Sequence, residues 1–185
     1  MSRPRWYWGV VIRVDAAHDV LAAVTAAADG DDVRAQDPRT GHITLFYAPL
    51  RSRNAAPELA ERVRAAAAAQ PAFDLRLAGF GEFPSDTRPV AWLGVADGAD
   101  RLDGLRAALC ACDEDCHRHP FVPHLTLAYG EDATAYAGAR DGIRAAADDA
   151  VVTARVDAVW VAGFPQSGHP ARDLRYVERI PLAGG

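Results

Sequence analysis

A tetrapeptide that occurs twice constrains this chain more than any other feature. His42–Leu45 (HITL) and His124–Leu127 (HLTL) both read His-x-Thr-Leu with an aliphatic residue at x. Each copy lies in an aromatic and β-branched segment, which predicts a strand. The flanking sequences differ (GHITLFYAP and PHLTLAYG), so the copies are not a recent duplication. Two accidental copies in a chain of this composition are expected on the order of once in several thousand, so we interpret the pair as meaningful.

Strand geometry places the histidine and the threonine of each copy on one face. Side chains two residues apart in a strand point to the same side, about 7 Å apart. If the two strands approach each other, one cleft receives His42, Thr44, His124 and Thr126. The aliphatic residues then point the other way, into a core: Ile43, Leu45, Leu125 and Leu127.

Two imidazoles and two hydroxyls in one cleft suit phosphodiester hydrolysis without a metal ion. Histidine titrates near pH 6.5, so one neutral imidazole can accept a proton from water while a protonated one protonates the leaving alkoxide. The hydroxyls can donate to phosphate oxygens as charge develops. Opposite protonation states of the two histidines predict a bell-shaped pH–rate profile. The alternative, polar histidines at strand edges, explains a single copy better than a matched pair.

Periodicity and turn residues predict an α+β fold with mostly antiparallel pairing, because strands and helices mix without strict βαβ alternation. The polar stretch between the first helix and His42 is predicted to be a loop. Strands are expected at 6–14, 42–47, 73–83, 90–95, 124–129, 151–164 (one long strand or a bent pair) and 174–182. Helices are expected at 15–28, 57–69, 100–116 and 132–147, and Trp92 and Trp160 are expected in the core.

Composition excludes several other classes of protein. No apolar run approaches the roughly 18 residues of a membrane span, and the N-terminus lacks a signal-peptide pattern, so we expect a cytoplasmic protein without membrane contact. The net charge of -5 disfavours generic binding to duplex nucleic acid. All 20 basic residues are arginine, which excludes a lysine Schiff base or a P-loop lysine.

A cluster of cysteines and histidines, CACDEDCHRH at 110–119, raises the alternative of a zinc site. On a helix Cys110 and Cys112 point about 200° apart, so both cannot face one ion, and the spacing differs from that of structural zinc sites. The odd number of cysteines argues against a secreted disulfide scaffold. We expect small buried thiols and exposed histidines here, and no metal or cofactor.

The repeated motif resembles the signature of the 2H phosphoesterase superfamily, and the chain is similar to its RNA 2',3'-cyclic phosphodiesterases, historically called bacterial 2'-5' RNA ligases. Further likeness lies in GEFPSDTRPVAWLGV, in PFVPHLTLAYG and in LRYVERIPL. The resemblance implies two pseudo-symmetric lobes in one domain spanning 1–185. Each lobe would have an antiparallel sheet that carries one motif, with helices outside and the active-site cleft between the lobes.

The resemblance also implies roles for individual residues. His42 would be the general acid to the leaving ribose oxygen and His124 the base for water, while Thr44 and Thr126 bind phosphate. Tyr47 stands where the family usually has a phenylalanine near the base or ribose, so we expect a nucleotide contact there.

Two positions depart from the family pattern. Tyr129 stands where the family often has an arginine that helps to hold phosphate, and Phe46 makes the rim of the first motif more apolar. Both are expected as nucleotide contacts. The missing positive charge has four candidate sources: Arg88, Arg118, Arg172 and Arg175. The loop at 166–175, which contains His169, is a candidate to lie over the cleft.

The expected substrates are RNA 2',3'-cyclic phosphate ends or cyclic nucleotides, opened to 2'-phosphates. Two alternatives stay open at this point: action on 2'-5' linked or cyclic oligonucleotides, including ligation, and a non-catalytic module that binds nucleotides or RNA ends. We expect a monomer without an obligate protein partner.

Overall fold

A computed structural model describes residues 6–28, 32–48, 55–110, 120–165 and 169–185. Its strands are β1 (Trp6–Arg13), β2 (Val33–Ala35), β3 (His42–Ala48), β4 (Phe73–Phe83), β5 (Val90–Asp97), β6 (His124–Gly130), β7 (Val151–Val156), β8 (Ala158–Pro165) and β9 (Arg175–Pro181). Its helices are η1 (Asp15–Ala17), α1 (His18–Ala27), η2 (Pro38–Thr40), α2 (Ala55–Ala68), α3 (Ala99–Leu109), α4 (Ala133–Ala147) and α5 (Pro170–Asp173).

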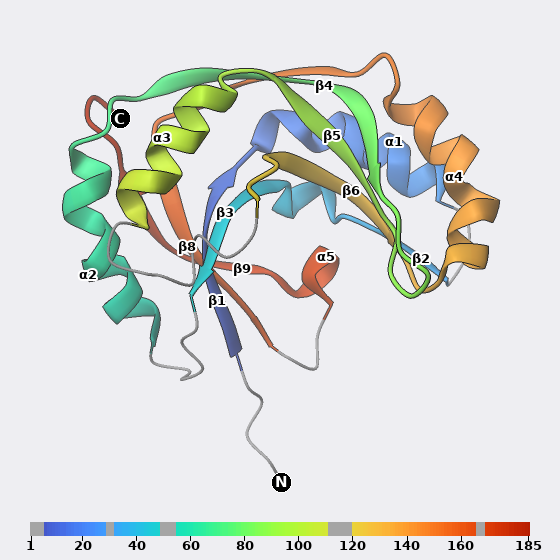
Figure 1. The fold of residues 1–185 in the computed structure, drawn as a ribbon, viewed down its shortest axis with the longest axis horizontal. Helices are drawn as coiled ribbons and strands as arrows, with labels where there is room; N and C mark the ends of the chain where they lie inside the picture. The colour runs from blue at the N-terminus through green and yellow to red at the C-terminus, as the bar shows by residue number, and fades with distance from the viewer. Residues whose placement is uncertain (1–5, 29–31, 49–54, 111–119, 166–168) are drawn as a thin grey trace, which may run out of the picture.

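The named strands belong to one antiparallel sheet with the order β7-β4-β5-β6-β3-β1-β8-β9, and β2 pairs with β6 beside this path. Figure 1 shows the sheet curled, with α2 and α3 at one side and α1 and α4 at the other. The predicted α+β fold with antiparallel pairing is therefore confirmed. No helix in the described part of the chain is long and apolar enough to cross a membrane.

The two motif strands are neighbours in the middle of this sheet. β3 and β6 are joined by one registered pair, Ile43 with Leu125. The second motif copy belongs to the half formed by β7, β4, β5 and β6, and the first to the half formed by β3, β1, β8 and β9. The structure thus joins in one sheet the strands that were expected in two lobe sheets, and the division of residues 1–185 into lobes of one domain stays a prediction.

The segment 151–164 has the second of its two expected forms, a bent pair, since β7 pairs with β4 and β8 pairs with β1. The structure differs from the expected elements at two other places. The polar stretch predicted as a loop contains β2, because Val33 and Ala35 are buried on one side of it. The loop before β9 contains the short helix α5. These short elements escape prediction because few residues carry their pattern.

The cysteine cluster gives one correction. Cys110 is buried and disulfide-bonded, so it is not the free thiol that was expected. All three cysteines of the chain lie in this cluster, and their odd number did not indicate a disulfide. The predicted helix ends at Leu109 in the structure, and the rest of the cluster, including Cys112 and the histidines, lies outside the described residues.

Candidate active site

The faces of the two motif strands are as the alternation predicted. The aliphatic residues of both copies are almost fully buried in the core: Ile43 (0%), Leu45 (2%), Leu125 (0%) and Leu127 (0% exposed). Because Ile43 pairs with Leu125 in antiparallel register, His42 comes next to Thr126 and Thr44 next to His124 across the two strands. The structure therefore brings the four predicted site residues together on one face at the centre of the sheet.

Each motif strand contains a β-bulge at the same motif position. In β3, Thr44 pairs with Val11 and Phe46 with Val10, which leaves Leu45 as the extra residue. A bulge shifts the alternation of the side chains that follow it. Phe46 is consequently turned into the core, where it is 6% exposed and contributes only to the wall of a cavity. Phe46 therefore lines the cavity beside His124 from the core side, and its role as a nucleotide contact stays a prediction.

The bulge in β6 repeats this geometry. Thr126 pairs with Trp92 and Ala128 with Ala91, so Leu127 is the extra residue. Leu127 and Ala128 are then both buried in succession. After the bulge, Tyr129 returns to the face of Thr126, as Tyr47 returns to the face of Thr44 in β3.

The two tyrosines extend the repeat to His-x-Thr-Leu-x-Tyr. Each tyrosine hydroxyl is hydrogen-bonded to the threonine of its own copy, Tyr47 to Thr44 and Tyr129 to Thr126. Burial around the hydroxyls raises the pKa of Tyr47 and raises that of Tyr129 to about 12. Both phenols therefore stay protonated at neutral pH and can donate to an anion. The sequence contains this signal, because a tyrosine stands five residues after each motif histidine. The two tyrosines were predicted singly as nucleotide contacts and not as part of the repeat.

Both motif histidines are held in the same way. The Nδ1 of His42 is 2.8 Å from the carbonyl oxygen of Thr40, and the Nδ1 of His124 is 2.7 Å from that of Val122. Since a carbonyl can only accept, each Nδ1 carries a hydrogen and donates it. In the neutral ring the lone pair is then on Nε2, which is left to exchange a proton with a substrate.

The electrostatic surroundings favour the neutral form of both rings. His42 is 6% exposed, and burial lowers its pKa, with a smaller lowering from the nearby His124 and an opposing effect of the bond to Thr40. Burial also lowers the pKa of His124, against the bond to Val122. Two close imidazoles that repel each other's positive charge titrate one after the other. One of them can thus be protonated while the other is neutral.

Aromatic residues from the β4–β5 hairpin enclose His124. The ring of Phe83 meets that of His124 edge-on at 4.9 Å between centroids, and Trp92 lies 6.1 Å away. Trp92 was expected only as a core residue, and Phe83 was not singled out. Both belong to the β4–β5 hairpin, of which β5 pairs with β6, and no local pattern indicates this pairing. A cavity of about 390 Å³ opens beside them, lined by Thr44, Tyr47, Phe83, Arg106, Phe121 and His124 among others.

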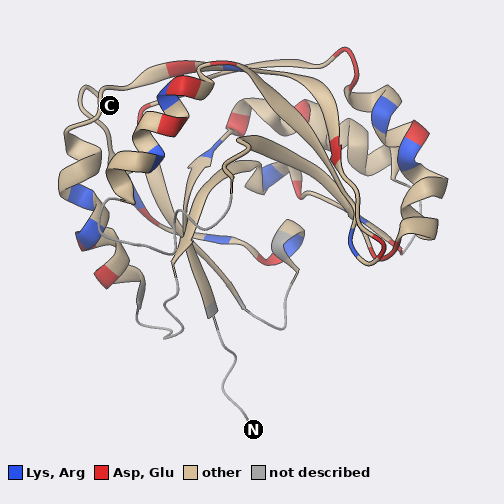
Figure 2. Ribbon diagram, in the orientation of Figure 1, with Lys and Arg blue, Asp and Glu red and all other residues tan. Residues whose placement is uncertain are grey.

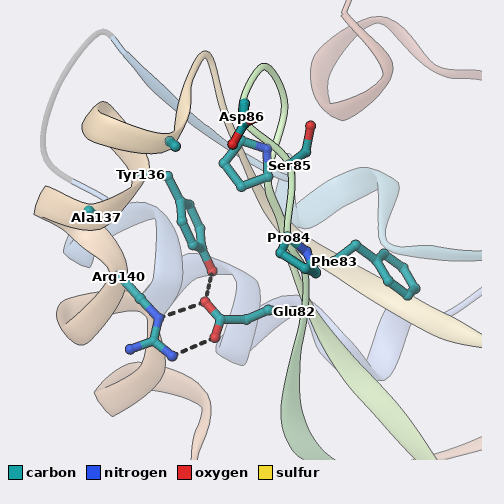
Figure 3. A pocket seen from close by; sticks show the side chains of 10 residues that line it. Glu82, Phe83, Pro84, Ser85, Asp86, Tyr136, Ala137 and Arg140 are labelled. Carbon is teal, nitrogen blue, oxygen red and sulfur yellow. Dashed lines mark hydrogen bonds and ion pairs between the residues drawn. The ribbon is translucent and has the colours of Figure 1, made fainter.

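A second cavity of about 580 Å³ lies behind the same hairpin, between Glu82–Asp86 and α4. Figure 3 shows Phe83 pointing away from the polar cluster of this cavity. In that cluster Glu82 accepts hydrogen bonds from Tyr136 (2.7 Å) and from two nitrogens of Arg140 (2.8 and 2.6 Å). Both oxygens of the carboxylate therefore accept hydrogen bonds. These bonds join α4 to the hairpin in which Phe83 packs against His124.

The arginine candidates take different places. The guanidinium of Arg88 lies 5.3 Å from the ring centroid of Tyr129. Arg172 lies in α5, close enough to His169 to lower its pKa. Arg175 begins β9, which is separated from β3 by β1 and β8. Arg118 lies outside the described residues. Of the four candidates, Arg88 is the one whose contacts in the described residues place it beside Tyr129.

The loop before β9 reaches the site through His169. The ring of His169 meets the ring of Tyr129 edge-on at 5.0 Å between centroids. The sequence predicts that the loop containing His169 lies over the cleft, and the structure places this histidine in contact with both Tyr129 and Arg88.

The centre of the site carries no charged side chain, since neither β3 nor β6 contains an acidic or basic residue apart from histidine (Figure 2). Among the residues that the structure describes, no group of three or more histidine, cysteine, aspartate or glutamate side chains is placed to hold a metal ion. The donors present are two imidazoles, two threonine hydroxyls and two phenols. This set can exchange protons and donate hydrogen bonds to an anion such as a phosphate group.

Comparison with known proteins agrees with this arrangement. The family model of the 2'-5' RNA ligase superfamily matches residues 13–164. A protein of Thermus thermophilus has a similar structure, with a TM-score of 0.61, 22% identity, and coverage of 95% of this chain and 97% of that one. E. coli LigT, solved in complex with 3'-AMP, has a TM-score of 0.63 and 17% identity, with 97% and 99% covered.

Usb1 of Kluyveromyces marxianus is also similar, with a TM-score of 0.56, 14% identity, and coverage of 95% of this chain and 98% of that one. No curated protein matches the sequence. At these identities the structural likenesses establish a shared fold.

Proposed function

The chain belongs to the 2'-5' RNA ligase superfamily, the 2H phosphoesterases, and we propose that it opens 2',3'-cyclic phosphates of RNA ends or nucleotides to 2'-phosphates without a metal ion. Membership of this superfamily supports phosphodiesterase activity on RNA. The observation that carries the finer proposal is the matched pair of histidines. Each donates from Nδ1 to a backbone carbonyl two residues upstream, which leaves both Nε2 atoms for the substrate.

In the proposed reaction the Nε2 of neutral His124 accepts a proton from water as the water oxygen attacks phosphorus. The bond between phosphorus and the ribose O3' breaks, and protonated His42 gives its Nε2 proton to that oxygen. The product is a 2'-phosphate, and the histidines have exchanged protonation states, which solvent restores. The family resemblance supports this order of acid and base.

The hydroxyls bind the phosphate in this scheme. Thr44 and Thr126 lie on the face of the histidines, next to His124 and His42 respectively, and donate to the nonbridging oxygens. Tyr47 and Tyr129 stay protonated and share a hydrogen bond with Thr44 and Thr126, so each threonine–tyrosine pair keeps one hydroxyl hydrogen for the phosphate. Hydrogen bonds that strengthen as charge develops on these oxygens stabilise the transition state more than the ground state.

The substrate is supported by the fold and by the shape of the site. A neighbour of the same fold, E. coli LigT, has been solved with 3'-AMP. The cavity beside His124 is lined by aromatic rings, including the half-exposed Tyr47 (51%), that can stack on a base.

The test is hydrolysis of the four nucleoside 2',3'-cyclic monophosphates in EDTA, with the 2'- and 3'-phosphates resolved. We expect turnover to the 2'-phosphate. A Thr126→Val variant should lose roughly 10²–10³-fold in kcat, since it lacks one oxyanion donor, whereas Thr126→Ser should stay within a few-fold. Formation of the 3'-phosphate, or equal activity of the two variants, would contradict the proposed assignment.

A further inference from the structure

Arg88 is an arginine without a carboxylate partner next to the candidate active site. It follows the turn at Ser85, whose hydroxyl accepts a hydrogen bond from the Arg88 backbone N–H at 3.1 Å. Within the described part of the chain no aspartate or glutamate forms an ion pair with Arg88. Its charge helps to lower the pKa of the nearby Glu131 carboxyl. Glu131 is paired with Arg34 instead. The positive charge of Arg88 is therefore not neutralised.

His169 faces Arg88 with a second hydrogen-bond donor. The backbone N–H of Ala171 points at the Nδ1 of His169 at 3.2 Å, so this nitrogen is the acceptor and has no hydrogen. In the neutral ring the hydrogen is then on Nε2, and Nε2 lies 3.2 Å from Nη2 of Arg88. In this tautomer two donors lie side by side with no acceptor of their own, and an anion beside them could accept a hydrogen bond from each.

The ring of His169 is neutral near pH 7. Burial lowers its pKa to about 4, helped by the positive charges of Arg88, Arg34 and Arg172 and opposed by Glu131. A bound anion would act in the opposite direction and raise this pKa.

Tyr129 connects this pair of donors to the proposed phosphate ligands. Its ring lies 5.3 Å from the Arg88 guanidinium and 5.0 Å from the His169 ring, and its hydroxyl is bonded to Thr126. The ring packing holds the long arginine side chain toward the site, so less side-chain entropy is lost when a ligand binds.

We propose that Arg88 and His169 form an anion-binding arm that takes a phosphate group of the substrate. This deepens the proposed function and rests on it for the identity of the ligand. The phosphate is either the reacting cyclic phosphate or the neighbouring phosphodiester of an RNA end, and both would meet the same donors.

Direct binding tests the arm without any turnover. Inorganic phosphate and a nucleoside 2'-monophosphate are titrated by calorimetry into the wild type, Arg88→Ala and Arg144→Ala. Arg144 is the matched control, since it lies on α4 beside Asp148, away from the site. We expect Arg88→Ala to weaken binding of the nucleotide at least tenfold and Arg144→Ala to leave it within twofold. In an NMR titration of the wild type, phosphate should raise the pKa of His169, and in Arg88→Ala that increase should shrink.

Kinetics then identify which phosphate binds. The substrates are a nucleoside 2',3'-cyclic monophosphate and a dinucleotide with the same cyclic end. An equal rise of KM for both in Arg88→Ala assigns the arm to the reacting phosphate, and a rise for the dinucleotide alone assigns it to the neighbouring phosphodiester. If wild type binds the nucleotide and Arg88→Ala does not, but neither substrate is hydrolysed, the arm stands and the proposed function fails. Unchanged binding in Arg88→Ala, or no binding by the wild type, overturns the arm.

Discussion

Gly81→Ala is expected to disturb both the stability of the fold and the surroundings of His124. An ideal Cβ at residue 81 would approach three atoms of the Trp92 ring to under 3.0 Å, a spacing that real Cβ atoms essentially never show. The same ring is already 3.2 Å from the position of a Cβ at Gly94, so it lies between two glycines. The ring must therefore move, and overpacking of this kind costs about 1–3 kcal/mol of unfolding free energy.

The displaced ring should also lower activity. Trp92 lies 5.4 Å from Phe83 and 6.1 Å from His124 between ring centroids. Misplacing a proton-transfer group by about 1 Å can cost up to about 10²-fold, so we expect kcat/KM on a 2',3'-cyclic nucleotide to fall roughly 10- to 100-fold.

Urea unfolding followed by circular dichroism measures the first effect, and initial rates measure the second. Gly104→Ala is the matched control, since it lies in α3 with no heavy atom within 4 Å of the new Cβ. The same change there should stabilise the protein by about 0.5–1 kcal/mol and leave activity unchanged. If Gly81→Ala were as stable and as active as the wild type, the tight packing of Trp92 against the hairpin would be refuted.

Further predictions concern pH, the phenols and the hairpin. The pKa values of His42 and His124 are both lowered from 6.5, so both limbs of the pH profile of kcat/KM, and its maximum, should lie below pH 6.5. A maximum above pH 7 in buffered rate measurements would contradict this. Tyr129→Phe should lower kcat/KM about 2- to 10-fold without moving that profile, because its pKa of about 12 keeps the phenol protonated throughout. Arg140→Ala should reduce the midpoint of urea unfolding only slightly, since its bonds to Glu82 are charge-assisted but the side chain is 39% exposed. A large decrease of the midpoint would show that the pair is more important than its exposure indicates.

The centre of the site could be predicted from the sequence because its signal is local. The period of two places His42 and Thr44 on one face and Ile43 in the core, and the second copy repeats that pattern. The same local reasoning failed after the motif, since a bulge at Leu45 depends on how β1 pairs with β3. Phe46 was consequently expected on the rim, whereas its side chain is buried in the core at the wall of the cavity.

Contacts between distant segments account for the remaining differences. Phe83 reaches His124 because the β4–β5 hairpin pairs with β6. His169 reaches Arg88 because α5 returns to the hairpin tip from the other end of the chain. Neither meeting follows from spacing or periodicity. The choice among the candidate arginines likewise required the fold, and the contact with Tyr129 distinguishes Arg88.

The most direct test of the two-histidine mechanism is the rate of 2',3'-cyclic nucleotide hydrolysis in EDTA for the wild type, His42→Ala and His124→Ala. His18→Ala is the control, because this histidine is exposed at the start of α1. The account predicts a loss of roughly 10²–10⁴-fold in each motif variant and none in the control. Hydrolysis that survives in both motif variants would place the active site elsewhere and contradict the account.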